Sequence, residues 1–186
     1  MCRILGFTAI AMITLAGFAA ARDQPAEVKL SADNTKIEFQ CSKMTNPVVT
    51  HVGGFKKFTG TASYQGNDLT TLKIKVDIDL NTLFTDEPKV TSHLKTPDFF
   101  DTKTYPTAKF ESTKVEKDGA DYKLTGKLTM HGKTKEVTFP AKLEAKDGGL
   151  NLTSKFKINR HDWAISYGKG FVIDDVSMDV TVNAKK

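Results

Sequence analysis

The residues best suited to metal binding or nucleophilic chemistry in this chain of 186 residues are four histidines and two cysteines. Zinc and haem sites place such ligands at short, characteristic spacings. The histidines are far apart along the chain, at His51, His93, His131 and His161. The sequence therefore predicts no metal site and no cofactor. Gly132 follows His131, which places that histidine in a turn.

The sequence contains none of the common motifs of acid–base or nucleophilic catalysis. The chain contains no G-x-S-x-G elbow, no phosphate-binding loop and no H-E-x-x-H helix. Asp98 and Asp101 flank two phenylalanines at positions typical of turns and helix ends. Arg160 and Asp162 would share one side of a continuing strand, which predicts an ion pair that holds the neighbouring Trp163. We therefore expect a protein that is not an enzyme.

The first 21 residues have the pattern of a secretory signal peptide. Arg3 is followed by an uncharged, mostly apolar run over residues 4–21, which ends in three alanines. Phe18 stands where a lipoprotein signal would need cysteine, so no lipid anchor is expected. These features predict cleavage near Ala21, one domain over residues 22–186, and a periplasmic or secreted protein. A permanent membrane anchor is the alternative.

The charge of the exported part is modestly positive. The chain has 27 basic and 22 acidic residues, and only Arg3 among them precedes residue 22, which leaves a net charge near +4. Such a charge mainly supports solubility, and it leaves transient contact with an anionic membrane surface open. Export argues against a nucleic-acid partner.

Cys41 has no disulfide partner in the exported chain, because Cys2 belongs to the signal peptide. Ile37, Phe39 and Cys41 alternate along one strand and share a face. This pattern favours a small buried hydrophobe over a reactive thiol.

Alternation with a period of two residues dominates the chain and predicts about eight principal strands. They cover residues 37–41, 58–64, 74–80, 108–115, 124–130, 137–143, 150–158 and 176–182. His131 and Gly132 form the turn of a β-hairpin. One short helix is predicted between Thr85 and Leu94, with Thr85 or Asp86 as its cap and Pro88 in its first turn.

Many short strands with one apolar face each predict an all-β antiparallel sandwich or barrel. One apolar phase should face a common interior: Phe39, Phe58, Tyr64, Ile78, Phe110, Leu128, Phe139 and Phe156. Small residues in the same phase favour an interior that holds a slender ligand over a solid one: Gly60, Ala62, Gly126, Ala141 and Ser154. Both interiors stay open at this level, since small residues also occur where a barrel bends.

Two long motifs resemble a known family. Residues 93–112 read HLKTPDFFDTKTYPTAKFES, and residues 126–140 read GKLTMHGKTKEVTFP. Together they are similar to the bacterial YceI-like, or polyisoprenoid-binding, proteins. Residues 52–60 and 159–165 resemble two further family segments, so the likeness covers nearly the whole exported chain. One departure is Val90-Thr91, where many members carry Arg-Asp.

The resemblance implies a lipocalin-like barrel whose long apolar pore holds a polyisoprenoid or another amphipathic lipid. We therefore expect a secreted, non-catalytic carrier. A solid barrel that binds a protein partner through its loops is the first alternative, and an enzyme that acts on a lipid is the second. A homodimer is compatible with the sequence.

The candidate site residues follow from the apolar phases and the motifs. The pore candidates are Phe39, Phe58, Tyr64, Ile78, Phe99, Phe100, Phe110, Leu128, Phe139, Phe156 and Trp163, and the candidates for a polar head group are His51, His93 and Arg160. Phe99 and Phe100 are adjacent, so both can point inward only from a segment that is not a regular strand. Such a pair either plugs the barrel or lines its pore.

Overall fold

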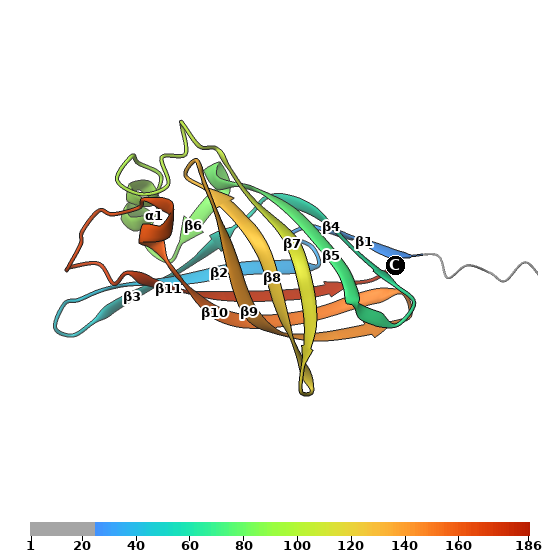
Figure 1. Cartoon of the computed structure of the whole chain (residues 1–186). Helices are drawn as coiled ribbons and strands as arrows, with labels where there is room; N and C mark the ends of the chain where they lie inside the picture. Colours follow the sequence, from blue (N-terminus) through green and yellow to red (C-terminus); the bar gives the residue numbers. More distant parts are fainter. Residues whose placement is uncertain (1–24) are drawn as a thin grey trace, which may run out of the picture.

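The computed structural model describes residues 25–186, so the predicted signal peptide lies outside the described residues. This part of the chain contains one antiparallel sheet of eleven strands, in the order β1-β4-β5-β7-β8-β9-β10-β11-β2-β3-β6 (Figure 1). The strands are β1 (Ala26–Leu30), β2 (Thr35–Lys43), β3 (Val49–Phe55), β4 (Phe58–Gln65), β5 (Asp68–Asp79), β6 (Leu83–Thr85), β7 (Thr107–Asp118), β8 (Asp121–Met130), β9 (Lys133–Lys146), β10 (Gly149–Asn159) and β11 (Asp175–Ala184).

Figure 1 shows that the sheet curls over on itself, and the apolar core residues pack together as one cluster. Hairpins join β7 through β10 in sequence, and β11 then pairs with β2, where Val180 lies opposite Ile37. The two sides of the curled sheet approach each other at the end where β1 lies near β10 and β11. There the Tyr64 hydroxyl donates a 2.7 Å hydrogen bond to the Gly149 carbonyl, which ties β4 to β10.

The predicted all-β antiparallel, lipocalin-like fold is confirmed, and the strand count is eleven rather than about eight. Each of the eight predicted ranges falls within a strand or ends one residue beyond it. The prediction omitted β1, β3 and β6. β1 and β6 are short, and β3 lacks clean alternation because Gly53 and Gly54 interrupt it. Gly53 is required there, since an added Cβ would lie 2.6 Å from the Phe39 ring.

One α-helix, α1 (Pro88–Leu94), is present in the described chain, with Pro88 in its first turn as predicted. Its N-cap is Glu87, so the prediction of Thr85 or Asp86 is wrong. Thr85 belongs to β6, and its backbone N–H donates to Thr91 Oγ1 at 2.8 Å, which fastens the helix to the sheet. Two 3-10 turns, Leu80–Thr82 and Arg160–Trp163, complete the helical elements. Neither α1 nor these turns is long enough to cross a bilayer as an apolar helix.

Aromatic rings fill the middle of the barrel. The Phe139 ring stacks on Phe156 at 4.1 Å between centroids, and Phe110 lies 5.8 Å from Phe139. Phe39, Phe58, Tyr64 and Ile78 are buried in the same core, and Leu128 packs against it. The predicted common interior of the eight strand residues is therefore confirmed.

Protein atoms occupy the space beside the small inward residues. The Phe110 ring lies directly over Gly126, and the β5 backbone lies against Gly60. Ala62 and Ala141 are fully buried in the core. Ser154 donates a 2.5 Å hydrogen bond to the Pro140 carbonyl. The use of these residues as a sign of an open interior is therefore wrong, because they accommodate neighbouring rings and strands.

Candidate ligand cavity

An apolar cavity of about 130 Å³ lies at the end of the barrel that α1 covers. Strands from both sides of the curled sheet form its wall, and α1 with the segments 95–106 and 160–174 forms its cover. The lining residues are Ile37, Phe39, Cys41, Ser42, Lys43, His51, Phe55, Ile78, Leu80, Val90, His93, Leu94, Phe99, Phe100, Ala108, Leu128, Met130, Ile158, Arg160, Ile165, Val172, Ile173, Val176 and Met178. Most of these side chains are aliphatic or aromatic, so the cavity presents an apolar surface.

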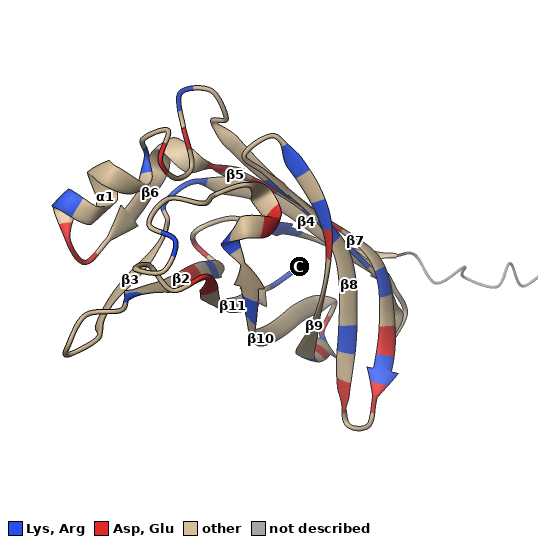
Figure 2. Ribbon diagram, turned by 60° about the vertical axis from the view of Figure 1, so that its left-hand side comes forward, with Lys and Arg blue, Asp and Glu red and all other residues tan. Residues whose placement is uncertain are grey.

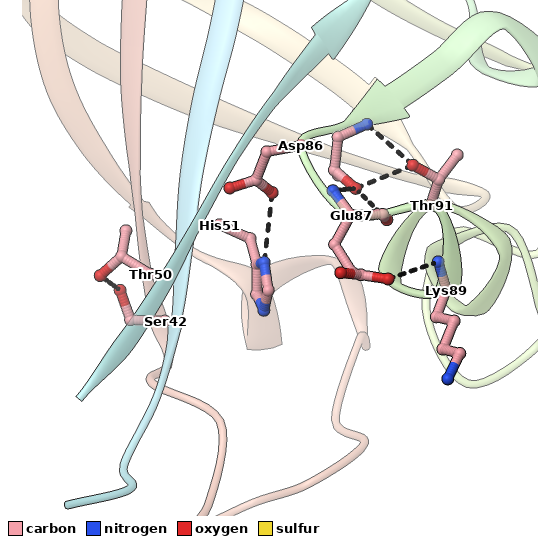
Figure 3. A network of polar contacts seen from close by, with 8 residues as sticks. Ser42, Thr50, His51, Asp86, Glu87, Lys89 and Thr91 are labelled. Carbon is pink, nitrogen blue, oxygen red and sulfur yellow. Dashed lines mark hydrogen bonds and ion pairs between the residues drawn. The ribbon is translucent and has the colours of Figure 1, made fainter. Parts of the chain in front are cut away.

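His51 enters the cavity wall from β3 and already has a polar partner. Its Nδ1 lies 3.2 Å from Asp86 Oδ1, and only 14% of its side chain is exposed (Figure 3). The Asp86 backbone N–H donates to the Val52 carbonyl at 3.0 Å, which fixes the carboxylate beside β3. Because Asp86 engages Nδ1, only Nε2 of His51 is left to meet a ligand.

Cys41 lies opposite His51 in the register of β2 and β3 and also lines the cavity. Burial raises the pKa of its thiol, and the nearby Asp86 carboxylate raises it further. The neutral thiol is therefore favoured, and a thiol is a weak nucleophile. This environment agrees with the prediction of a small hydrophobic side chain.

His93 stands at the C-terminal end of α1 and meets the cover of the cavity. Its Nε2 lies 2.9 Å from Asp98 Oδ2. Its ring contacts Phe99 and Tyr167 edge-on, each at 5.0 Å between centroids. The histidine thus joins α1 to the loop after it and to the loop that contains Tyr167.

Phe99 and Phe100 both line the cavity, as the sequence allowed for a segment that is not a strand. The chain turns tightly here, because the Phe100 N–H donates to the Leu94 carbonyl and the Asp101 N–H donates to the Thr96 carbonyl. Asp101 has a positive φ of 45°. Phe99 and Phe100 are not in a strand, so their side chains do not have to point to opposite faces. Both rings therefore form one section of the cavity wall.

Arg160 is buried, with 5% of its side chain exposed, and it organises the loop 160–174. Its guanidinium donates to the carbonyls of Ile165, Tyr167 and Val172 at 2.7–3.1 Å and to Asp174 Oδ1 at 2.9 Å. The predicted Arg160–Asp162 pair is wrong. Residues 160–163 form a 3-10 turn instead of continuing the strand, so residues two apart do not share a side.

Asp174 accepts hydrogen bonds from two side chains, those of Arg160 and His161. The pKa of its carboxyl is lowered chiefly by the hydrogen bond from His161 Nε2 at 2.7 Å, and the nearby Arg160 charge lowers it further. The ionised carboxylate therefore holds the side chains of Arg160 and His161, the first two residues of the 3-10 turn. Trp163 completes this corner, because its Nε1 donates to the Leu128 carbonyl at 3.0 Å.

The predicted site residues fall into two groups. Eight line the cavity: Phe39, Phe99, Phe100, Ile78, Leu128, His51, His93 and Arg160. Six lie outside its lining, in the core or packed against it: Phe58, Tyr64, Phe110, Phe139, Phe156 and Trp163.

Several lining residues were not among the predicted site residues. Ile37, Val176 and Met178 belong to the apolar phases of predicted strands, so their alternation was the available signal. Ile165, Val172 and Ile173 come from a loop with no periodic pattern, and Arg160 places that loop over the cavity.

A family model described as the YceI-like domain matches residues 29–185. The chain belongs to the YceI-like family. Among curated YceI-like relatives, a UPF0312 protein of Pectobacterium atrosepticum is 32% identical, with 96% of this chain and 94% of the relative covered. Protein YceI of Escherichia coli is 30% identical, with 96% and 95% covered.

Solved structures of YceI-like and similar proteins share the fold. BcnA of Burkholderia cenocepacia is 26% identical with a TM-score of 0.72, and the match covers 81% of this chain and 96% of BcnA. A Campylobacter jejuni YceI protein is 27% identical with a TM-score of 0.59, covering 72% and 84%. A polyisoprenoid-binding domain from Saccharophagus degradans shows the same fold at 15% identity, with a TM-score of 0.63 and 86% and 99% covered.

The departure from the YceI-like motif at Val90-Thr91 has a place in the cavity. Val90 lines it, and Thr91 Oγ1 bonds to Thr85 at 2.8 Å. This chain therefore has an apolar cavity residue and a helix anchor at the two positions where the family resemblance leads one to expect Arg-Asp.

Proposed function

We propose that this protein binds the apolar chain of a polyisoprenoid or a similar amphipathic lipid in the cavity below α1, and that it acts as a carrier without catalysis. The observation that carries the proposal is a nearly all-apolar lining whose histidines and the terminal nitrogens of whose arginine already have protein partners, while the buried Arg160 Nε has none. A cavity of this kind binds mainly through desolvation of its occupant.

The energetics favour chain length over head-group chemistry as the basis of selectivity. Burial of apolar surface contributes about 25 cal/mol per Å², or about 0.8 kcal/mol for each methylene. A neutral hydrogen bond from His51 or His93 would add only about 0.5–1.5 kcal/mol. Several buried methylenes therefore outweigh one polar contact.

Isoprenoids are the first ligand class to test because the Saccharophagus degradans domain with this fold is described as polyisoprenoid-binding. The cavity also disfavours the alternative of a solid barrel that acts only through its loops. The neutral, buried thiol of Cys41 gives no support to a lipid-modifying enzyme.

We further propose that the protein is exported and begins near Arg22. The apolar run at residues 4–21 and the alanines that end it support this proposal. Mass measurement of protein recovered from the periplasm or medium should give a chain without residues 1–21, without lipid and with one free thiol. A full-length chain in the membrane fraction would contradict export by cleavage.

Titration with geraniol, farnesol and geranylgeraniol tests the binding proposal. Affinity should rise by more than about tenfold with each added isoprene unit until the cavity is full, since each unit adds several buried carbons. Equal affinity across the series, with strong dependence on the head group, would contradict the proposal.

A matched pair of variants assigns that binding to the cavity. Ala108→Phe adds a ring to the cavity wall, and Lys109→Phe adds the same ring to the exposed outer face of the same strand. The first variant should lose binding, and the second should keep it. Equal binding by both folded variants would place the ligand elsewhere.

A further inference from the structure

Large apolar side chains are exposed on two loops at the cavity end. The β2–β3 hairpin presents Met44, Val48 and Val49, and the loop after Trp163 presents Tyr167 and Phe171; we call these five residues the apolar rim. Met44 is 61% exposed, Val48 59% and Phe171 50%. Isolated exposed apolar residues are common on soluble proteins, but a cluster on adjacent loops is typical of an interaction surface.

Backbone hydrogen bonds hold the two loops side by side. The Met44 N–H donates to the Phe171 carbonyl at 2.8 Å, and the Ile173 N–H donates to the Ser42 carbonyl at 2.9 Å. A β-bridge also joins Lys43 to Val172. The apolar rim is therefore one surface built from segments far apart in the sequence.

The two segments that carry the apolar rim have basic charge only, and the exposed Asp98 near Tyr167 is paired with His93. Residues 42–50 and 163–173 contain Lys43 and Lys169 and no aspartate or glutamate. Figure 2 shows the β2–β3 hairpin tip without acidic residues, whereas the β7–β8 hairpin carries both signs. The adjacent Asp174 is bonded to Arg160 and His161. Exposed apolar and aromatic groups with nearby lysines suit the interface of an anionic bilayer.

The apolar rim is continuous with the cavity. Ser42, Lys43, Val172 and Ile173 line the cavity and lie within two residues of Met44 or Phe171 in the chain. A surface on which the rim rested would therefore meet the segment 160–174, which belongs to the cavity cover.

We propose that the apolar rim docks transiently on an anionic membrane surface, with its side chains among the head groups and Lys43 and Lys169 against the lipid phosphates. This proposal extends the proposed carrier function by naming the surface from which an apolar chain would enter. Docking is measured without cargo, so the two proposals can fail separately.

Vesicle sedimentation tests the docking proposal. A chain that begins at Arg22 contains every strand and the whole core described above, and it lacks the apolar run of residues 4–21. It should bind vesicles of phosphatidylcholine with phosphatidylglycerol more strongly than vesicles of phosphatidylcholine alone. Binding should weaken as salt rises, because salt screens the lysine contacts.

Two variants distinguish binding through the apolar rim from nonspecific adsorption to vesicles. Val48→Asp removes a rim side chain just before β3, and Val52→Asp makes the same change within β3 at an exposed residue outside the rim. Val48→Asp should lower the vesicle partition coefficient by about tenfold, and Phe171→Asp should do the same. Val52→Asp should leave it unchanged.

Three results would overturn the docking proposal. The first is that the protein does not bind anionic vesicles. The second is that Val48→Asp and Val52→Asp reduce vesicle binding equally. The third is concentration-dependent self-association without vesicles that Val48→Asp abolishes. The last result would assign the apolar rim to contact between copies of the chain.

Discussion

The middle of the barrel and its α1 end are built from the same strands but are packed differently. In the middle, Phe139 stacks on Phe156, and the tilted Phe110 ring beside them lies over Gly126. At the α1 end, loops cover an apolar cavity and polar contacts hold those loops in place. Close packing thus stabilises one region, and hydrogen-bonded loops keep space open in the other.

A matched pair of leucines on β8 gives the largest expected effect. Leu124→Ala removes a fully buried side chain from the packed middle and should lower the free energy of unfolding by about 4 kcal/mol. Leu128→Ala removes a side chain that already borders the cavity and should cost about 2 kcal/mol, since fewer packed contacts are lost. Urea unfolding measures both, and equal losses would contradict the difference in packing.

Removal of the Arg160 side chain should damage the α1 end selectively. Arg160→Leu leaves three loop carbonyls without their donor and Asp174 with His161 alone, and should lower the free energy of unfolding by about 3 kcal/mol. Amide hydrogen exchange should increase first over residues 160–174. Uniformly faster exchange throughout the sheet would show that the arginine supports the whole barrel instead.

An added phenyl ring should lower the free energy of unfolding by about 2 kcal/mol more in the packed middle than at the cavity. Ala141→Phe forces a ring into the filled middle, and such insertions usually cost about 1–3 kcal/mol. Ala108→Phe places its ring in the existing cavity and should change stability by less than about 1 kcal/mol. Thermal unfolding of the two variants decides the matter. A large loss for Ala108→Phe would mean that the cavity cannot accept an added ring.

Acid should loosen the α1 end with a small effect on the middle. The pKa of Asp174 in the folded protein lies below its ordinary value of 3.8, so its stabilisation is complete above that value and is lost as pH falls through the folded pKa. Fluorescence of Trp163, the single tryptophan, should report this change. Asp174→Asn should flatten the acid response; an unchanged response would assign it to another group.

The sequence predicted most of the sheet because alternation of apolar and polar residues has a direct structural cause. Strand side chains point to opposite faces, so one buried face imposes a period of two. The runs at residues 74–80 and 124–130 show this pattern and form strands as predicted, except that Leu80 begins a 3-10 turn. β3 lacks the pattern because Gly53 must accommodate the Phe39 ring, a contact made between strands.

The sequence by itself determined the antiparallel fold, the interior phase of the strands and the family motifs. The tertiary structure alone decided that Arg160 bonds to Asp174 and that residues from the loop 160–174 close the cavity. It also decided which aromatic rings fill the barrel and which border open space. The physical reason is range: a strand pattern is set by neighbouring residues, whereas a cavity is set by the fit of segments that meet only in the folded chain.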